Sequence, residues 1–236
     1  MENISKRIEK YWDTRSADFS RVRRMEIEGA DFTAWNEIIK KHLPAGKNLK
    51  VLDVGTGAGF FAVLFSKLGC KVTGVDMSSK MLVEAEKNIS AFNCRADFYK
   101  MNAQELTFGA ESFDVVISRN LTWTLPDAMQ AYKEWFRVLK VGGVLMNFDS
   151  DYGNKNFLNE ETCAKGEVAD EMLTECNEIK NSLRISTHNR PRWDIELLEN
   201  LGLKVTSDSD IAPLVHVDKK LDYDAVPLFG IYAAKI

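Results

Sequence analysis

The sequence has few of the residues that build metal sites, disulfide frameworks or membrane spans. Its 236 residues include only four cysteines and three histidines. No two cysteines form a CxxC pair, so neither a zinc site nor a set of disulfides is expected. The longest apolar run, residues 58–65, is far shorter than the ~18 residues of a membrane-spanning helix. We therefore expect free thiols, no metal and no membrane partner.

Neither sign of charge is in large excess. The chain has 31 Lys+Arg against 35 Asp+Glu, a formal net charge of -4. Its densest basic patch, Arg21, Arg23 and Arg24, is short and is interpreted as a solvated helix face, so a nucleic-acid partner is not expected. Residues 1–13 lack the apolar centre of a signal peptide. The cytoplasm is the expected location, with a monomer or a homodimer as the expected assembly.

Apolar strands alternate with amphipathic helices from residue 50 onward. Strands are predicted at 51–54, 71–75, 97–101, 113–118 and 144–149, with closing strands at 203–206 and 228–234. Such alternation predicts βαβ units, and continuous apolar runs are typical of parallel strands covered on both faces. The predicted fold is α/β, a doubly wound, mostly parallel seven-stranded sheet.

The flanking segments are expected to complete one domain over residues 1–236. Residues 1–48 are predicted to form N-terminal helices, and residues 49–149 are predicted to form the cofactor-binding core. Residues 150–190 break the alternation with a polar stretch and an amphipathic helix, which predicts a helical cap insertion after the fifth strand, over the substrate. Residues 191–236 predict a closing helix and strands. The length suits a single domain.

A glycine-rich turn follows the first strand of the core. Gly55, Gly57 and Gly59 occupy this strand-to-helix turn, where glycines allow the backbone to approach a ligand closely. Asp76 ends the next strand, and a carboxylate there can accept hydrogen bonds from ribose hydroxyls. The two features together predict a cofactor that contains a nucleoside.

The spacing of this turn indicates which nucleoside. A dinucleotide site uses G-x-G-x-x-G with a diphosphate on the helix N-terminus, but here Phe60 stands where the last glycine would be. Asp53, two residues before Gly55, would repel a diphosphate and favour an ammonium group. The residues therefore favour S-adenosylmethionine. A nicotinamide-dependent oxidoreductase is the less favoured alternative.

The chain resembles the class I (Rossmann-like) S-adenosylmethionine-dependent methyltransferases, of the type 11, ubiquinone/menaquinone-biosynthesis-like group. The resemblance covers roughly residues 11–149 and rests on five motifs in family order. They are VLDVGTGAGF at 51–60, VTGVDMSSKML at 72–82, MNAQELTF at 101–108, FDVVISRNLTWTLPD at 113–127 and EWFRVLKVGGVLM at 134–146.

The resemblance implies roles for individual residues around the cofactor. Gly55 and Gly57 would lie against its methionine moiety, with Asp53 near the amino group, Asp76 on the ribose and Met77 beside the adenine. The full set implied to bind the cofactor is Tyr11, Asp53, Gly55, Thr56, Gly57, Asp76, Met77, Asn102, Ala103, Gln104, Arg119 and Asn120. Asn102 stands where the family often has aspartate. Tyr11 and Trp12 resemble a segment that closes over the cofactor, or else pack the first helix on the sheet.

Methyl transfer needs alignment more than it needs a catalytic dyad. It is an in-line displacement at a sulfonium carbon, for which the protein supplies orientation and, for some acceptors, a base. The candidate catalytic residues are His188, Tyr152 and Arg119, although Arg119 could equally be an ion pair within the fold. Trp123 is interpreted as core, and His216 is expected near a strand or an edge.

Two arginines beside the cap leave an alternative open. Arg190 and Arg192 would either meet an anionic substrate or be solvated charges at a helix start. The predicted function is S-adenosylmethionine-dependent methyl transfer to a small-molecule acceptor. A non-catalytic protein that binds the cofactor on the same fold is the alternative.

Overall fold

The computed structural model describes residues 3–158, 168–221, 223 and 225–236, which form a seven-stranded sheet. The strands are β1 (Lys50–Val54), β2 (Lys71–Asp76), β3 (Asp97–Lys100), β4 (Phe113–Arg119), β5 (Leu139–Ser150), β6 (Leu203–Asp208) and β7 (Leu228–Lys235). Their order is β3-β2-β1-β4-β5-β7-β6, and β7 runs antiparallel to both of its neighbours. The predicted doubly wound, mostly parallel sheet is confirmed.

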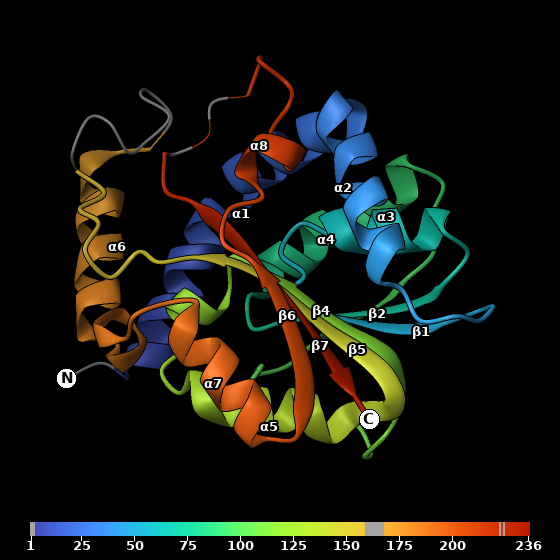
Figure 1. The fold of residues 1–236 in the computed structure, drawn as a ribbon. Coiled ribbons are helices and arrows are strands. Elements are labelled where there is room, and N and C mark those ends of the chain that lie inside the picture. Colours follow the sequence, from blue (N-terminus) through green and yellow to red (C-terminus); the bar gives the residue numbers. More distant parts are fainter. Residues whose placement is uncertain (1–2, 159–167, 222, 224) are drawn as a thin grey trace.

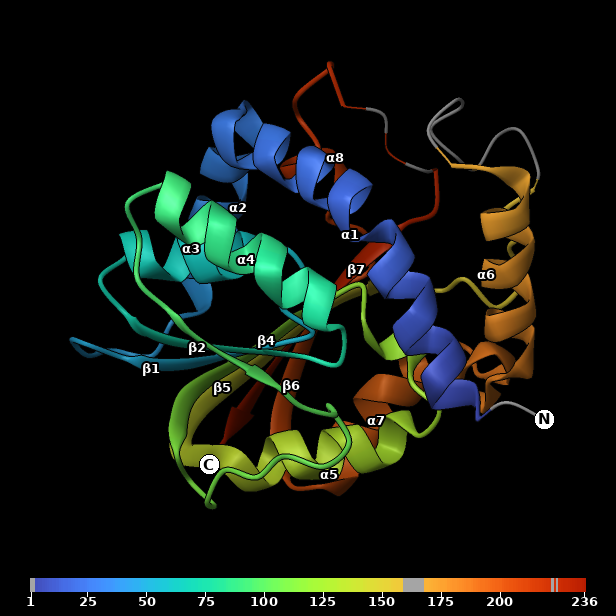
Figure 2. The same cartoon turned by 180° about the vertical axis from the view of Figure 1, so that it is seen from behind.

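Helices cover both faces of this sheet (Figure 1). They are α1 (Ile4–Glu28), α2 (Ala30–His42), α3 (Phe60–Lys67), α4 (Ser79–Ala91), α5 (Ala128–Val138), α6 (Asp170–Ser182), α7 (Arg192–Asn200) and α8 (Ala212–Val215), with short 3-10 turns η1 (Thr122–Thr124) and η3 (Arg184–Thr187). Figures 1 and 2 show α5 and α7 against one face, and α2, α3 and α4 over the other. Both views show α1 and α6 side by side at one end of the molecule.

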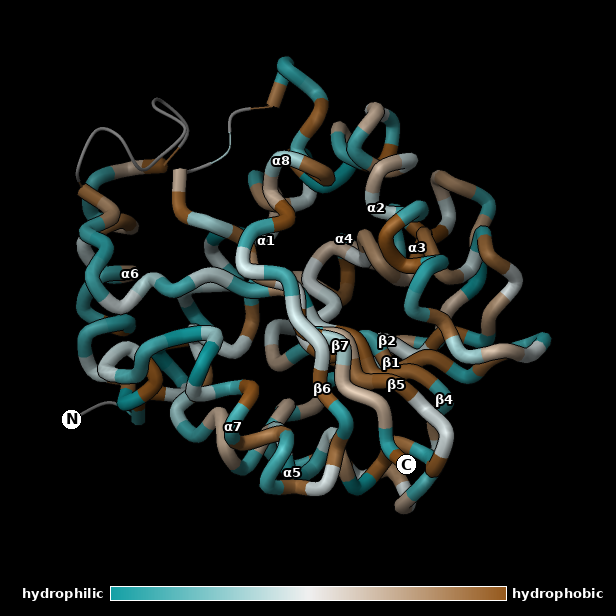
Figure 3. Tube along the Cα trace, in the orientation of Figure 1, coloured by the Kyte–Doolittle hydropathy of each residue, from teal (hydrophilic) through white to brown (hydrophobic). Residues whose placement is uncertain are grey.

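Alternate strand residues supply the two halves of the core. Val115 and Ile117 of β4 pack into the cluster beneath α2 and α3, whereas Val116 packs into the cluster on the opposite face. Figure 3 shows apolar residues following the strands. Both faces are buried because helices cover each of them, which explains the continuous apolar runs in the sequence.

Strand β5 begins earlier than the predicted strand at 144–149. It starts at Leu139 and includes Gly142 and Gly143. The register against β4 shifts here, because Phe113 pairs with Leu139 and Val115 pairs with Val144. The glycines therefore accommodate an irregularity of the strand, as glycine does at β-bulges.

The described part of the predicted cap contains α6 and η3. Residues 159–167, which the prediction also covers, lie outside the described residues, so the division into core and cap stays a prediction, as do the cytoplasmic location and the state of assembly. Within the described ranges, no helix is both long and apolar enough to cross a membrane. The same ranges contain no cluster of side chains suited to a metal ion.

Candidate functional site

The turn after β1 has a backbone that only glycine adopts easily. Gly55, Gly57 and Gly59 have φ of 67°, 52° and 83°, in the left-handed region that side chains with a Cβ disfavour. The amide of Gly55 donates to the carbonyl of Val75 at 2.8 Å, which ties the turn to β2. A Cβ at residue 57 would lie 3.2 Å from the ring of Phe19. The absence of side chains at these glycines thus allows the turn to pass close beneath α1.

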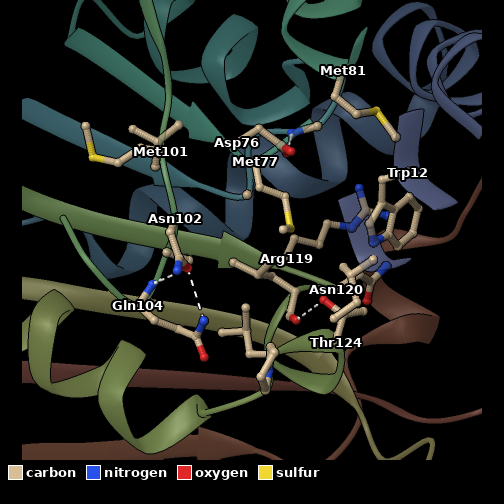
Figure 4. A pocket seen from close by; sticks show the side chains of 18 of the residues that line it. Trp12, Asp76, Met77, Met81, Met101, Asn102, Gln104, Arg119, Asn120 and Thr124 are labelled. Carbon is tan, nitrogen blue, oxygen red and sulfur yellow. Dashed lines mark hydrogen bonds between the residues drawn. The ribbon is translucent and has the colours of Figure 1, made fainter. Parts of the chain in front are cut away.

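A first cavity of about 700 Å³ opens beside this turn (Figure 4). It lies at the carboxyl ends of β1, β2 and β4, where ligands bind in open α/β sheets. Most residues of the predicted cofactor-binding set line it, namely Gly55, Gly57, Asp76, Met77, Asn102, Ala103, Gln104, Arg119 and Asn120. Ile8, Trp12 and Phe19 of α1 also border the cavity, so the first helix forms part of its wall.

Asp76 is held by backbone donors at the end of β2. Its two carboxylate oxygens accept hydrogen bonds from the amides of Gly57 and Ser78, each at 2.9 Å. Burial raises the pKa of Asp76 to about 6. Each carboxylate oxygen has a second lone pair. The side chain can therefore still accept hydrogen bonds from a diol such as ribose.

Another part of the first cavity combines apolar walls with a polar edge. Met77 and Ala103 supply apolar surface, and Asn102 and Gln104 the edge. The side-chain oxygen of Asn102 accepts from the backbone and the side-chain amides of Gln104, at 3.0 and 3.1 Å (Figure 4). This oxygen is therefore already engaged in hydrogen bonds within the protein. A carboxylate at this position would have a second oxygen to offer to a ligand.

A side cavity of about 340 Å³ adjoins the glycine turn and is bordered by Asp53, Thr56 and Asn120, and also by Arg23 and Arg119. Asp53 accepts a hydrogen bond from the Thr56 hydroxyl at 2.6 Å, and burial raises its pKa to about 7. The side-chain oxygen of Asn120 is buried without a partner among the described residues, and this residue has φ of 53°. An orphaned acceptor beside a buried carboxylate favours a cationic donor. Together with Asp76, these residues fit a nucleoside with an ammonium-bearing tail.

A second cavity of about 1300 Å³ lies between α1 and α6 and shares a wall with the first. Trp12, Phe19, Arg119 and Asn120 border both cavities. Its own lining is rich in aromatic side chains, which are Tyr11, Trp123, Tyr152, Phe157 and Tyr223. Tyr11 therefore borders the second cavity, and Trp123 is both buried and part of the wall. The rings of Trp123 and Tyr152 lie 4.9 Å apart.

Arg119 lies on the shared wall and also forms an ion pair. Its guanidinium lies 2.9 Å from the carboxylate of Glu26, which is fully buried. Arg23 pairs with the same carboxylate at 2.6 Å. Despite the cost of burial, the two arginines lower the pKa of Glu26 to about 2. Arg23, predicted to be a solvated residue, is 12% exposed in its side chain, so that interpretation is wrong for this member of the patch.

The other predicted catalytic residue, His188, lies apart from both cavities. Its ring stacks on Trp193 at 4.4 Å, and it borders neither cavity. His216 borders the second cavity, with its ring stacked on Tyr223 at 3.6 Å. Burial and the nearby Arg119 lower the pKa of His216 to about 4. Sequence reasoning missed His216, Tyr223 and Arg15 as site residues because their segments come together only in the fold.

Arg190 neither meets solvent nor borders the two cavities. Its side chain is 2% exposed and lies 2.8 Å from Asp194 and 3.3 Å from Asp149. Asp149 also accepts hydrogen bonds from the Thr122 hydroxyl and, at 3.0 Å, from the amide of Trp123. The network therefore supports the wall of the second cavity from behind. Arg192, in contrast, is 78% exposed.

Comparisons with known proteins agree with this geometry. Residues 52–147 match the family described as "Methyltransferase domain". A demethylmenaquinone methyltransferase of Chlorobaculum parvum is 36% identical over 105 residues, which are 44% of this chain and 42% of that protein. One of Listeria monocytogenes is 31% identical over 157 residues, 65% of this chain and 66% of that protein. The chain spans about half the length of the first curated relatives it matches.

Solved structures show the same fold. The crystal structure of an S-adenosylmethionine-dependent methyltransferase from Aquifex aeolicus superposes with a TM-score of 0.59 at 17% identity. The superposition covers 92% of this chain and 98% of that one. At this identity the likeness concerns architecture, because one fold supports many activities.

Proposed function

The chain is a member of the class I, type 11 methyltransferases of the ubiquinone/menaquinone-like group, and on that premise we propose that it transfers a methyl group from S-adenosylmethionine to a small-molecule acceptor. The observation that carries the proposal is the shared wall, since Trp12, Phe19, Arg119 and Asn120 border both cavities. The first cavity takes the cofactor and the second the acceptor. When bound, the cofactor supplies a methyl group activated by a sulfonium.

Residues at the carboxyl ends of the strands hold the cofactor. Asp76, already oriented by the amides of Gly57 and Ser78, accepts hydrogen bonds from the ribose. Asp53 and the unpartnered oxygen of Asn120 attract the ammonium group, and Met77 packs on the adenine. The acceptors of Asp76, Asp53 and Asn120 match the ribose and ammonium donors of this cofactor, so these residues fit it.

Helix α1 aligns the two ligands and excludes water. Trp12 and Phe19 border both cavities, so an acceptor seated beside these rings lies next to the cofactor. Alignment of this kind can lower a barrier by up to ~7–11 kcal/mol. Tyr152 and Arg119 are the predicted catalytic residues that border the acceptor. The relatives named demethylmenaquinone methyltransferase support a small-molecule acceptor.

Calorimetric titration with S-adenosylhomocysteine tests the cofactor. The expected result is binding that is lost in Asp76→Ala and retained in Asp97→Ala, an exposed carboxylate at the start of β3. No binding at millimolar ligand contradicts the proposal, and tighter binding of a nicotinamide dinucleotide would indicate the oxidoreductase instead. Transfer of labelled methyl from S-adenosylmethionine into pools of small molecules then separates the enzyme from a non-catalytic protein, for which binding occurs without transfer.

A further inference from the structure

Three arginines border the second cavity, and one of them has no acidic partner among the described residues. Arg23 and Arg119 share one carboxylate, that of Glu26, at 2.6 and 2.9 Å. Arg15 donates to the hydroxyl of Tyr11 at 3.2 Å, and within the described residues it pairs with no carboxylate. The cationic side chains of this wall therefore exceed the carboxylate that balances them.

Each of the three guanidinium groups also has one N–H donor that makes no hydrogen bond within the described residues. The Nε atoms of Arg15, Arg23 and Arg119 are buried and have no hydrogen-bond partner in the described part of the chain. A buried donor without an acceptor is costly, and native proteins leave few of them. Arg23 and Arg119 also border the side cavity beside Asp53, whereas Arg15 borders the second cavity and neither of the other two. The unused donor of Arg15 therefore favours a ligand in the second cavity that has acceptors and negative charge.

The other ionisable groups near this cavity, among the residues that the structure describes, do not cancel the excess. Asp31 lies behind Tyr223, where it accepts hydrogen bonds from that hydroxyl and, at 2.7 Å, from the amides of Val217 and Asp218. Asp18 is exposed at the rim. The lowered pKa of His216 leaves its ring neutral near pH 7. The carboxylates are thus either engaged elsewhere or open to water, which screens them.

A further cation lies behind the aromatic part of the wall. The ammonium of Lys155 lies 5.4 Å from the ring centre of Tyr152 and 5.6 Å from that of Phe157. Both rings border the second cavity, as do Trp123 and Leu173. The cavity thus combines apolar surface for the body of a ligand with positive charge for one end of it.

We propose, resting on the function proposed above, that the methyl acceptor is an organic anion whose aromatic or aliphatic body fills this cavity and whose carboxylate or phosphate binds Arg15. A guanidinium suits either group because it can offer two parallel N–H donors. Arg23 and Arg119 add positive potential from the deeper wall, where the surrounding rings keep water away. Arg15 lies on the same helix as Trp12 and Phe19, so the anion binds beside the two rings that border both cavities.

Probes that differ only in charge test this inference on the full chain saturated with S-adenosylhomocysteine. We would titrate 2-naphthoate, 2-naphthyl phosphate and the neutral 2-naphthamide, and follow the fluorescence of the tryptophans, two of which border the cavity. At least one anion is expected to bind at least about tenfold more tightly than the amide. The preferred anion distinguishes a carboxylate from a phosphate acceptor.

Variants of Arg15 test whether this residue causes the preference for the anion. Arg15→Met should abolish the preference for the anion, whereas Arg15→Lys should retain part of it, because the charge stays and the two-donor geometry is lost. Arg21→Met removes the same charge from an exposed position of α1 and should leave the preference unchanged. S-adenosylhomocysteine should bind all three variants as it binds the parent chain.

Three results would overturn the inference. They are equal binding of amide and anions, absence of binding of both anions at millimolar concentration, and a preference that survives Arg15→Met. Failure of the parent chain to bind S-adenosylhomocysteine would instead overturn the proposed function, so the two failures can be told apart.

Discussion

Phe19 of α1 lies over Gly57 of the glycine turn, so closely that a Cβ at residue 57 would come within 3.2 Å of its ring. The same ring borders both the first and the second cavity. The backbone amide of Gly57 donates to Asp76 at 2.9 Å. One glycine thus links the first helix, the turn and the carboxylate that we propose binds the ribose.

Replacing Gly57 should therefore cost binding as well as stability. Gly57→Ala places a side chain at φ of 52° and against Phe19. Gly69→Ala is the matched control, since its φ is 79° and its Cβ would meet nothing within 4 Å. Both variants should lose about 1–2 kcal/mol of unfolding free energy in urea, the cost of the left-handed backbone. Only Gly57→Ala should raise the dissociation constant of S-adenosylhomocysteine, by about tenfold or more; equal binding by the two variants would refute the link.

Replacing Asn102 with aspartate should strengthen cofactor binding. Its side-chain oxygen already accepts two hydrogen bonds from Gln104, whereas aspartate would keep these and present a second oxygen to the exocyclic amine of adenine. We expect Asn102→Asp to bind S-adenosylhomocysteine about two- to tenfold more tightly. Asn93→Asp, an exposed loop position, controls for the added charge. The gain should vanish with S-inosylhomocysteine, which has no such amine, and a gain that persists there would exclude this hydrogen bond as its cause.

Asp53 should make the free protein less stable as the pH rises. Burial raises its pKa from 3.8 to about 7, so the folded chain holds a proton that the unfolded chain releases near pH 4. This contribution is complete below pH 4 and is lost as the pH rises through 7. Asp53→Asn keeps an oxygen for Thr56 and removes the titration. Its unfolding free energy relative to the parent should rise by about 2–4 kcal/mol between pH 4 and pH 8.

The control for this comparison is Asp97→Asn, an exposed carboxylate, whose difference from the parent should stay nearly constant with pH. A constant difference for Asp53→Asn as well would contradict the burial argument. Cofactor binding should weaken in Asp53→Asn, because this variant lacks the carboxylate that we propose attracts the ammonium group. The charge of Asp53 would then destabilise the free fold and strengthen binding of the cofactor.

The sequence predicts those parts of the site that are local in the chain. The apolar run of β1, the glycines after it and Asp76 at the end of β2 lie within one βαβ unit, where spacing dictates geometry. The second cavity is different, because Arg15 and His216 come from opposite ends of the chain. His188, which lies near the end of the predicted cap, stacks on the nearby Trp193 and borders neither cavity. Short-range patterns do not encode which distant segments come together around a cavity.

Arg190 shows the same limit, since a charged residue beside a proline gives no sign in the sequence of being 2% exposed. Its guanidinium lies between Asp149 and Asp194, and its Nη2 donates to the Thr122 hydroxyl at 2.5 Å. Asp194 also accepts a hydrogen bond from the Tyr132 hydroxyl at 2.7 Å. Removing the cation leaves two buried carboxylates without compensation.

Arg190→Met should therefore lower the unfolding free energy by about 3–5 kcal/mol. Arg192→Met makes the same change two residues away, where the side chain is 78% exposed and pairs with Glu196, and should cost at most about 1 kcal/mol. Urea unfolding at pH 7 measures both. Adding Asp194→Asn to Arg190→Met should restore part of the loss by removing one uncompensated charge. If the double variant is no more stable than Arg190→Met alone, the loss is one of packing against Phe229 and not of charge.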